Sequence, residues 1–131
     1  MLVIFDCDGT LIDSEIIAAA IDAEAMGRLG MSISAAEFAL RFTGMPHREM
    51  WRIIEADFGR PLPAGFMEEL REVSIRRFAE ELKVIEGVHD AVAAVDGIGL
   101  KRCIASSTEL PSLKRNLSTT GLIDVFDPHV F

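Results

Sequence analysis

The chain begins with a continuous apolar run and then changes to helical spacing. Residues 1–5 read Met-Leu-Val-Ile-Phe, which is typical of a parallel strand buried on both faces. From residue 14 to residue 83, apolar side chains recur at the three- and four-residue spacing of a helix face. The pattern therefore predicts one strand followed by a long, almost wholly helical segment.

Turn and capping residues divide this segment into four predicted helices. Gly30 and Gly59 are typical helix stops. Ser34 with Glu37 three residues later has the form of a capping box. The predicted helices cover residues 16–29, 32–42, 47–58 and 66–83.

Beyond Gly87 the pattern alternates between helix and strand. A helix is predicted over 88–95, a strand over 100–105 and a helix over 111–122, and the apolar pairs 125–126 and 130–131 indicate a third strand. Such alternation is typical of a parallel α/β sheet.

The predicted fold is α/β, with an incomplete Rossmann-like parallel sheet core and an inserted four-helix cap. The core would comprise residues 1–13 and 84–131, and the cap residues 14–83. A sheet with so few strands leaves the edge of its first strand exposed. Self-association through this edge is one consequence that we expect.

Composition excludes several kinds of partner. Half of the 131 residues are apolar and the net charge is −8, which argues against a nucleic-acid groove because such grooves need clustered Lys and Arg. No apolar run has the length of a membrane span, and the N-terminus lacks a signal-type pattern. We expect a cytoplasmic protein with no nucleic-acid or membrane partner.

The cysteines and histidines do not form a site in the sequence. Cys7 and Cys103 lie in or beside apolar runs, so we expect both to be buried free thiols. His47, His89 and His129 lie far apart without metal-ligand spacing, and are expected to be structural or surface residues.

Two carboxylates follow the first strand. Asp6 and Asp8 share one face if the strand spacing continues, and ligands in open α/β sheets bind where strands end. Asp8 with Gly9 is also an ordinary turn signal. An acidic pair at a strand end suits a metal ion together with a phosphate.

A hydroxyl-rich run follows the second predicted strand. Ser106, Ser107 and Thr108 precede a predicted helix, where hydroxyl and backbone N–H groups can bind phosphate. The alternative is an ordinary helix cap. Because parallel strands end at the same side of a sheet, the run is expected near the aspartates.

These two motifs resemble those of a known superfamily. Residues 5–15 look like the first motif of the haloacid dehalogenase-like phosphohydrolases, and residues 103–107 resemble the second. The helical insert is similar to the C1 cap of the subgroup that contains β-phosphoglucomutase and phosphoglycolate phosphatase. Residues 84–88 resemble the point where that cap returns to the core.

The resemblance implies a role for each motif residue. Asp6 would be the nucleophile that forms an aspartyl-phosphate, and Asp8 the general acid and base. Mg²⁺ would be held by the Asp6 carboxylate and the Asp8 backbone carbonyl. Ser106 would bind the transferring phosphoryl group, with backbone N–H groups near Gly9 and Ser107. A carboxylate approaching a phosphate needs such charge neutralisation.

The chain also departs from the superfamily pattern. The superfamily uses a lysine after the third strand and acidic residues after the fourth, whereas this sequence ends at Phe131. The lysines of the chain, which are Lys83, Lys101 and Lys114, all precede the position of the superfamily's lysine. Asp124 and Asp127 come too early to be the acidic residues. We therefore expect a partial form that binds Mg²⁺ poorly and has little turnover.

The implied activity is a Mg²⁺-dependent phosphatase of a small phosphorylated metabolite, expected to be a sugar phosphate. Mutases of the subgroup carry a histidine where Ala18 stands, which favours a hydrolase. The alternatives are a hexose-phosphate mutase and a non-catalytic fragment or regulatory domain.

A cap loop offers candidates for substrate specificity. Residues 43–48 match the superfamily's specificity loop in position, so Arg41, Gly44 and Arg48 are candidates to contact a substrate's distal group. Both arginines are equally consistent with solvated helix residues. Trp51, at helical spacing with Ile54, is expected in the cap core.

Overall fold

The computed structural model describes residues 1–126 and 128–131, and these divide into two compact units. The first unit contains residues 1–14 and 77–131, and the second contains residues 15–76. Asp127, one of the acidic residues considered from the sequence, lies outside the described residues. The interpretation of 14–83 as a cap stays a prediction, and the unit boundary at Arg77 falls inside the last predicted helix of that segment.

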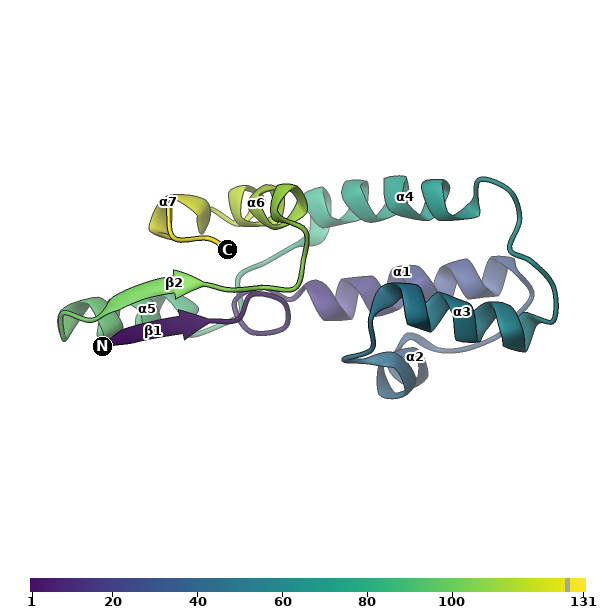
Figure 1. Ribbon diagram of the computed structural model, residues 1–131, viewed down its shortest axis with the longest axis horizontal. Coiled ribbons are helices and arrows are strands. Elements are labelled where there is room, and N and C mark those ends of the chain that lie inside the picture. The colour runs from purple at the N-terminus through teal and green to yellow at the C-terminus, as the bar shows by residue number, and fades with distance from the viewer. Residues whose placement is uncertain (127) are drawn as a thin grey trace. The chain divides into compact units, whose positions relative to one another are not determined.

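Strands and helices alternate as shown in Figure 1. Their bounds are β1 Leu2–Phe5, α1 Ser14–Arg28, α2 Ala35–Phe42, α3 His47–Phe58, α4 Phe66–Glu81, α5 Val88–Gly97, β2 Lys101–Ile104, α6 Leu110–Thr119 and α7 Ile123–Phe126. The predicted α/β class is correct, with a parallel sheet in the first unit.

The sheet pairs β1 with β2 in parallel, with Phe5 opposite Ile104. On the other edge of β2, Ile104 forms an isolated parallel bridge with Val130. The Ile104 N–H donates to the His129 carbonyl at 2.9 Å, and the Phe131 N–H donates to the Ile104 carbonyl at 3.0 Å. The last described residues therefore start a third strand beside β2, as their apolar pattern predicted.

The prediction that residues 125 and 126 belong to that strand is wrong. They lie in α7, a short helix that packs against β2. The Phe126 ring meets the Phe5 ring edge-on, with centroids 5.6 Å apart. This tertiary contact outweighs the local strand preference of a Val-Phe pair.

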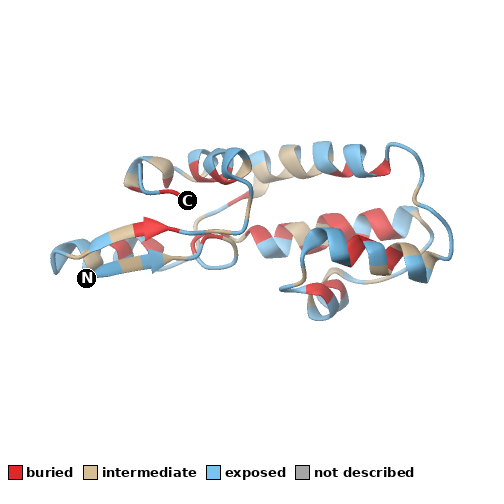
Figure 2. Ribbon diagram, viewed as in Figure 1, coloured by how far each residue is buried: buried red, intermediate tan, exposed pale blue. Residues whose placement is uncertain are grey.

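The first strand is less buried than its sequence predicts. Leu2 is 52% exposed and Ile4 is 62% exposed, and Figure 2 shows this contrast with the buried end of β2. Within the described residues β1 pairs only with β2, so its other edge is open, as expected. Self-association through that edge stays a prediction.

The second unit has its own apolar core. Trp51 and Ile54 are 4% and 0% exposed, and the Trp51 ring lies edge-on to Phe66 at 5.2 Å. The prediction that Trp51 is a core residue is confirmed. The predicted capping box is also present, because the Ser34 hydroxyl accepts from the Glu37 N–H while the Glu37 carboxylate accepts from the Ser34 N–H.

Two further expectations can be compared with the structure. Cys7 and Cys103 are both buried free thiols, as predicted. Among the described residues, the helices are all too short or too polar to cross a bilayer.

Candidate active site

The loop after β1 folds back on one carbonyl group. The Cys7 carbonyl accepts from the N–H groups of Thr10, Leu11 and Ile12 at 3.2, 2.8 and 3.2 Å. Gly9 has a φ of 70°, a left-handed conformation in which glycine carries no steric cost. The tight turn predicted for Asp-Gly is thus real, and it holds the two motif aspartates at the end of the strand.

Asp8 is bound by three hydroxyl groups. Ser14 donates to Oδ1 at 2.7 Å, while Ser106 and Thr108 donate to Oδ2 at 3.2 and 2.8 Å. Two of these donors lie about a hundred residues further along the chain. The structure therefore brings the first and second motifs together at one carboxylate.

Asp6 is more open to solvent. Its Oδ2 accepts one hydrogen bond, from the Thr10 hydroxyl at 3.3 Å, and the residue is exposed. An exposed carboxylate directly beyond β1 is accessible to a ligand, in contrast with the half-buried, hydrogen-bonded carboxylate of Asp8.

Cys7 lies between the two aspartates in the chain, and the pKa of its thiol responds to their negative charge. Burial, and then the negative charges of Asp8 and Asp6, raise the pKa of the Cys7 thiol to about 12. A thiol with that pKa stays protonated at neutral pH and is a poor nucleophile. The negative charge of the loop therefore comes from its carboxylates, and their field favours a cation.

The hydroxyl run after β2 is not a helix cap. Helix α6 begins at Leu110, and its N-cap residue Glu109 makes no side-chain cap hydrogen bond. Instead, the Ser106 hydroxyl accepts from the Thr108 N–H at 3.0 Å and donates to Asp8. The run therefore orients a carboxylate rather than the end of a helix, which removes the alternative interpretation for Ser106 and Thr108.

Backbone contacts join the ends of the two strands. The Ala105 N–H donates to the Phe5 carbonyl at 3.0 Å, and the Ser106 N–H donates to the Phe131 carbonyl at 3.0 Å. The Gly9 N–H already donates to the Ile12 carbonyl at 2.9 Å. Two of the predicted phosphate-binding groups, the Gly9 N–H and the Ser106 hydroxyl, therefore already donate hydrogen bonds within the chain.

A short double-stranded junction, formed by residues 11–13 and 83–85, supports the loop. Ile12 and Val84 form an antiparallel bridge, and the Ile85 N–H donates to the Leu11 carbonyl at 3.0 Å. Asp13 accepts from the Lys83 N–H through Oδ1 at 2.7 Å and donates its own N–H to the Lys83 carbonyl at 3.1 Å. This junction fixes the chain just after the motif.

The oxygen donors of the motif fit a hard cation such as Mg²⁺, which prefers carboxylate and carbonyl ligands. The described residues include no group of three or more His, Cys, Asp or Glu side chains arranged to hold a metal. Among the described residues, the two motif aspartates would thus provide only part of a coordination sphere for such an ion.

The candidate specificity residues lie in the second unit. Arg41 Nη2 pairs with Asp57 Oδ2 at 2.5 Å, and its guanidinium lies 4.9 Å from the Phe42 ring centroid. Arg48 lines a cavity of about 550 Å³ that Arg52 also lines, and Gly44 lies in the turn between α2 and α3. Their role in specificity stays a prediction.

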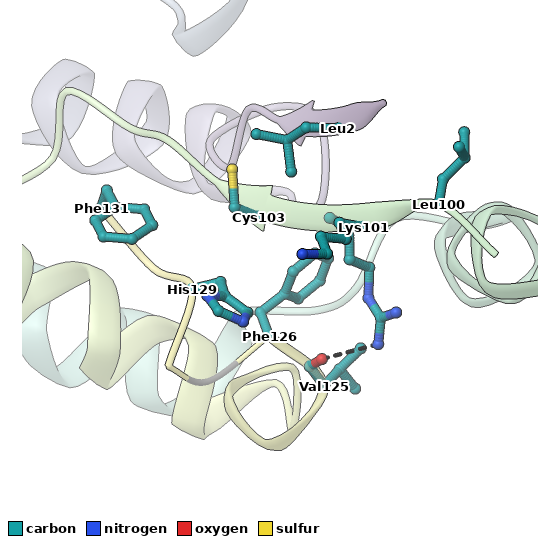
Figure 3. Close-up of a pocket in the computed structure, with 9 residues that line it drawn as sticks. Leu2, Leu100, Lys101, Cys103, Val125, Phe126, His129 and Phe131 are labelled. Atoms are coloured by element: carbon teal, nitrogen blue, oxygen red, sulfur yellow. Dashed lines mark hydrogen bonds between the residues drawn. The ribbon is translucent and has the colours of Figure 1, made fainter.

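Another cavity, of about 520 Å³, lies beside β2 in the first unit (Figure 3). Arg102 is among the residues that line it, and its Nη2 donates to the Val125 carbonyl at 3.0 Å. The Arg102 side chain also pairs with Asp96 and lies 5.5 Å from the Phe126 ring centroid. Its lining includes none of the motif residues that we predict to act in catalysis.

Two hydroxyl donors were missed in the sequence. Thr10 and Ser14 were not predicted as site residues, although each donates to a motif aspartate. The local signal was present, because both lie within the first motif. Thr108 belongs to the hydroxyl run that was expected near the aspartates, and it donates to Asp8.

Known proteins resemble the chain along nearly its whole length. It is 28% identical over 130 residues to a 6-phosphogluconate phosphatase of Escherichia coli strain K12, which covers 98% of this chain and 58% of that protein. A haloacid dehalogenase-like protein of unknown function from Agrobacterium tumefaciens strain C58 matches with a TM-score of 0.88 and 34% identity over 99% of this chain and 57% of that one. A hydrolase from Deinococcus radiodurans R1, solved with bound phosphate and sodium, matches with a TM-score of 0.79 and 25% identity over 99% and 56%.

The chain thus spans somewhat more than half the length of these relatives. The family model of the haloacid dehalogenase-like hydrolases matches residues 3–130. With both motifs joined at Asp8 and the fold shared, this chain belongs to the haloacid dehalogenase-like hydrolase family.

Proposed function

We propose that the protein containing this chain is a Mg²⁺-dependent phosphatase of a small phosphorylated metabolite, in particular a sugar phosphate. The observation that carries the proposal is the position of Asp8. The hydroxyls of Ser106 and Thr108 donate to its carboxylate, and the exposed Asp6 lies two residues earlier in the chain. The similarity to a 6-phosphogluconate phosphatase supports the substrate class.

In the proposed reaction a carboxylate oxygen of Asp6 attacks the phosphorus atom. The bond between phosphorus and the leaving oxygen breaks, and Asp8 protonates that oxygen. Asp8 then removes a proton from water, which attacks the phosphorus and releases phosphate and the Asp6 carboxylate. Such acid–base help contributes about 10²- to 10⁴-fold in rate, and the three hydroxyls on Asp8 keep its carboxyl group oriented.

The remaining groups would bind the phosphoryl oxygens. The Ser106 hydroxyl would turn its single O–H from Asp8 to them when the substrate binds, aided by backbone N–H groups near Ser107. The Asp6 carboxylate and the Asp8 backbone carbonyl would hold Mg²⁺, which supplies charge neutralisation at the phosphoryl group.

The test compares Asp6→Asn with the unchanged full-length protein and with the 131-residue chain. Phosphate release is measured with Mg²⁺ on a panel of sugar phosphates, and Asp90→Asn, at an exposed position in α5, serves as a charge-matched control. We expect Asp6→Asn to abolish release in the full-length protein, and Asp90→Asn to leave it intact. Undiminished release by Asp6→Asn would exclude the nucleophile assignment.

The same assay distinguishes the alternatives. Conversion of one hexose phosphate into its isomer, without net phosphate release, would indicate a mutase. A folded full-length protein that neither releases nor moves phosphate on any member of the panel would indicate a non-catalytic domain.

A further inference from the structure

The two oxygens of the Asp8 carboxylate are hydrogen-bonded unequally. Ser106 and Thr108 donate to Oδ2 at 3.2 and 2.8 Å, and Ser14 donates to Oδ1 at 2.7 Å. A carboxylate oxygen accepts through two lone pairs. The two hydroxyls on Oδ2 therefore occupy both of its acceptor positions.

The oxygen of Ser106 is held in place independently of its hydrogen. The backbone N–H of Thr108 donates to Ser106 Oγ at 3.0 Å, which fixes this oxygen against the loop. A serine hydroxyl carries one hydrogen, and that hydrogen can rotate about the bond between carbon and oxygen. The Ser106 O–H can therefore leave Asp8 by rotation alone, without a movement of the loop.

Thr108 is suited to keep its bond to Asp8 during such a rotation. Its bond to Oδ2 is the shorter of the two, and the residue is half-buried. A β-branched side chain is stiff about its first torsion, which favours one direction of the hydroxyl. Thr108 also precedes Glu109, the N-cap residue of α6, so helix α6 does not require the Thr108 hydroxyl as a cap.

We propose that Thr108 is the positioning residue of the acid–base carboxylate, and that a bound phosphoryl group frees Asp8 by withdrawing the Ser106 O–H. The inference rests on the proposed function, in which that O–H turns to the phosphoryl oxygens. The rotation vacates one lone pair of Oδ2, which then carries the proton that Asp8 passes to the leaving oxygen. Thr108 and Ser14 each keep one carboxyl oxygen in place, so Asp8 does not lose its orientation when Ser106 leaves it.

The orientation of Asp8 can be measured without any catalytic activity. Side-chain coupling constants, recorded by nuclear magnetic resonance on the 131-residue chain, show whether the first torsion of Asp8 occupies one rotamer or several. Ser106→Ala imitates the state in which the Ser106 O–H has left Asp8, and we expect a single rotamer there. Ser106→Ala combined with Thr108→Val removes both donors to Oδ2, and should give averaged couplings. The matched control combines Ser106→Ala with Thr119→Val, at an exposed position of α6, and should keep the single rotamer.

Two results of this measurement would overturn the proposal. One is averaging already in Ser106→Ala, because Thr108 would then be unable to hold Asp8 without Ser106. The other is a single rotamer in the variant that lacks both donors, because Thr108 would then be unnecessary. Circular dichroism checks that each variant is folded, and if the double variant is not, the couplings of Ser106→Ala still decide the matter.

Turnover of the full-length protein tests the same residue in the reaction. Since hydrogen bonds to charged groups are the stronger ones, we expect Thr108→Val to lower kcat for a sugar phosphate about 10- to 100-fold. KM should stay within about twofold, because Ser106 still binds the phosphoryl group. Thr108→Ser keeps the hydroxyl and should retain kcat within about threefold, and Thr119→Val should leave it unchanged. With p-nitrophenyl phosphate, whose leaving group departs readily without a proton, the first turnover should slow less.

The reaction has its own contradicting results. Full turnover by Thr108→Val, a change in KM instead of kcat, or an equal loss of first-turnover rate on both substrates would overturn the positioning role. If the unchanged full-length protein releases no phosphate, the proposed function fails, while the Asp8 couplings still decide whether Thr108 holds the carboxylate.

Discussion

Replacing Ile104 with alanine is expected to destabilise the first unit strongly. Ile104 is 0% exposed, lies opposite Phe5 in the sheet and bridges Val130 on its other side. The substitution removes side-chain carbon atoms while keeping every backbone hydrogen bond possible. Ile4→Ala is the matched control, because Ile4 is in the neighbouring strand and is 62% exposed.

The magnitude follows from the carbon atoms that lose their packing. At about 0.8 kcal/mol for each buried methylene, the three carbons removed at Ile104 are worth about 2.4 kcal/mol. The cavity left behind raises the cost further within the range of about 2–5 kcal/mol known for such deletions. Since Ile4 is 62% exposed, the same deletion there costs about 0.9 kcal/mol on this scale. Loss of strand propensity is common to both variants.

Urea unfolding followed by far-ultraviolet circular dichroism measures both free energies of unfolding. We expect Ile104→Ala to lower the free energy of unfolding by at least about 1.5 kcal/mol more than Ile4→Ala, with equal dependence on urea concentration. If the free energies of unfolding of the two variants agree within about 0.5 kcal/mol, the inference that burial of the Ile104 side chain stabilises the first unit strongly is refuted.

The further predictions concern three single residues. Cys7 should be unreactive toward Ellman's reagent at pH 8 and react only after denaturation, because its pKa is about 12 in the folded protein. Because the pKa of Cys7 is raised above the ordinary 9.0, the contribution of the Cys7 thiol to the free energy of unfolding is complete below pH 9 and should be lost between pH 9 and 12. Urea unfolding across that range measures this loss. Cys7→Ala should remove the pH dependence that comes from the thiol. Ser34→Ala should cost about 1 kcal/mol through loss of the capping box, as measured by thermal unfolding against Ser32→Ala, outside the box. Gly59→Ala should destabilise α3 by about 1 kcal/mol in the same assay, because Gly59 has a φ of 73°, and equal melting temperatures would contradict this.

Helices whose ends are marked locally were predictable. The bounds of α3 agree with the prediction at both ends, because Pro46 precedes the helix and Gly59 ends it within the same short stretch of sequence. The Ser34 capping box is likewise a relation between near neighbours. Helix α7 was missed because its formation depends on the packing of Phe126 against Phe5, which local spacing does not encode.

The candidate site was predictable in part for the same reason. Strand parity and parallel topology lead to Asp8 and Ser106, which are hydrogen-bonded in the structure. Whether Thr108 reaches Asp8 together with Ser106 depends on how the chain turns between Ala105 and Glu109. The bond from Thr108 spans a hundred residues of sequence, and no periodicity of the chain anticipates it.

The junction of residues 11–13 and 83–85 has a consequence for how such a protein can change. The chain leaves this junction and returns to it at residues that are hydrogen-bonded to each other. The segment between them is therefore a loop whose two ends are held together. The entropy of closing a loop grows only with the logarithm of its length, at about 0.6 kcal/mol for each doubling. The intervening helices can therefore be lengthened, shortened or exchanged at small cost, while Asp6 and Asp8 stay in place. The helical insert can therefore change during evolution while the motif aspartates are conserved.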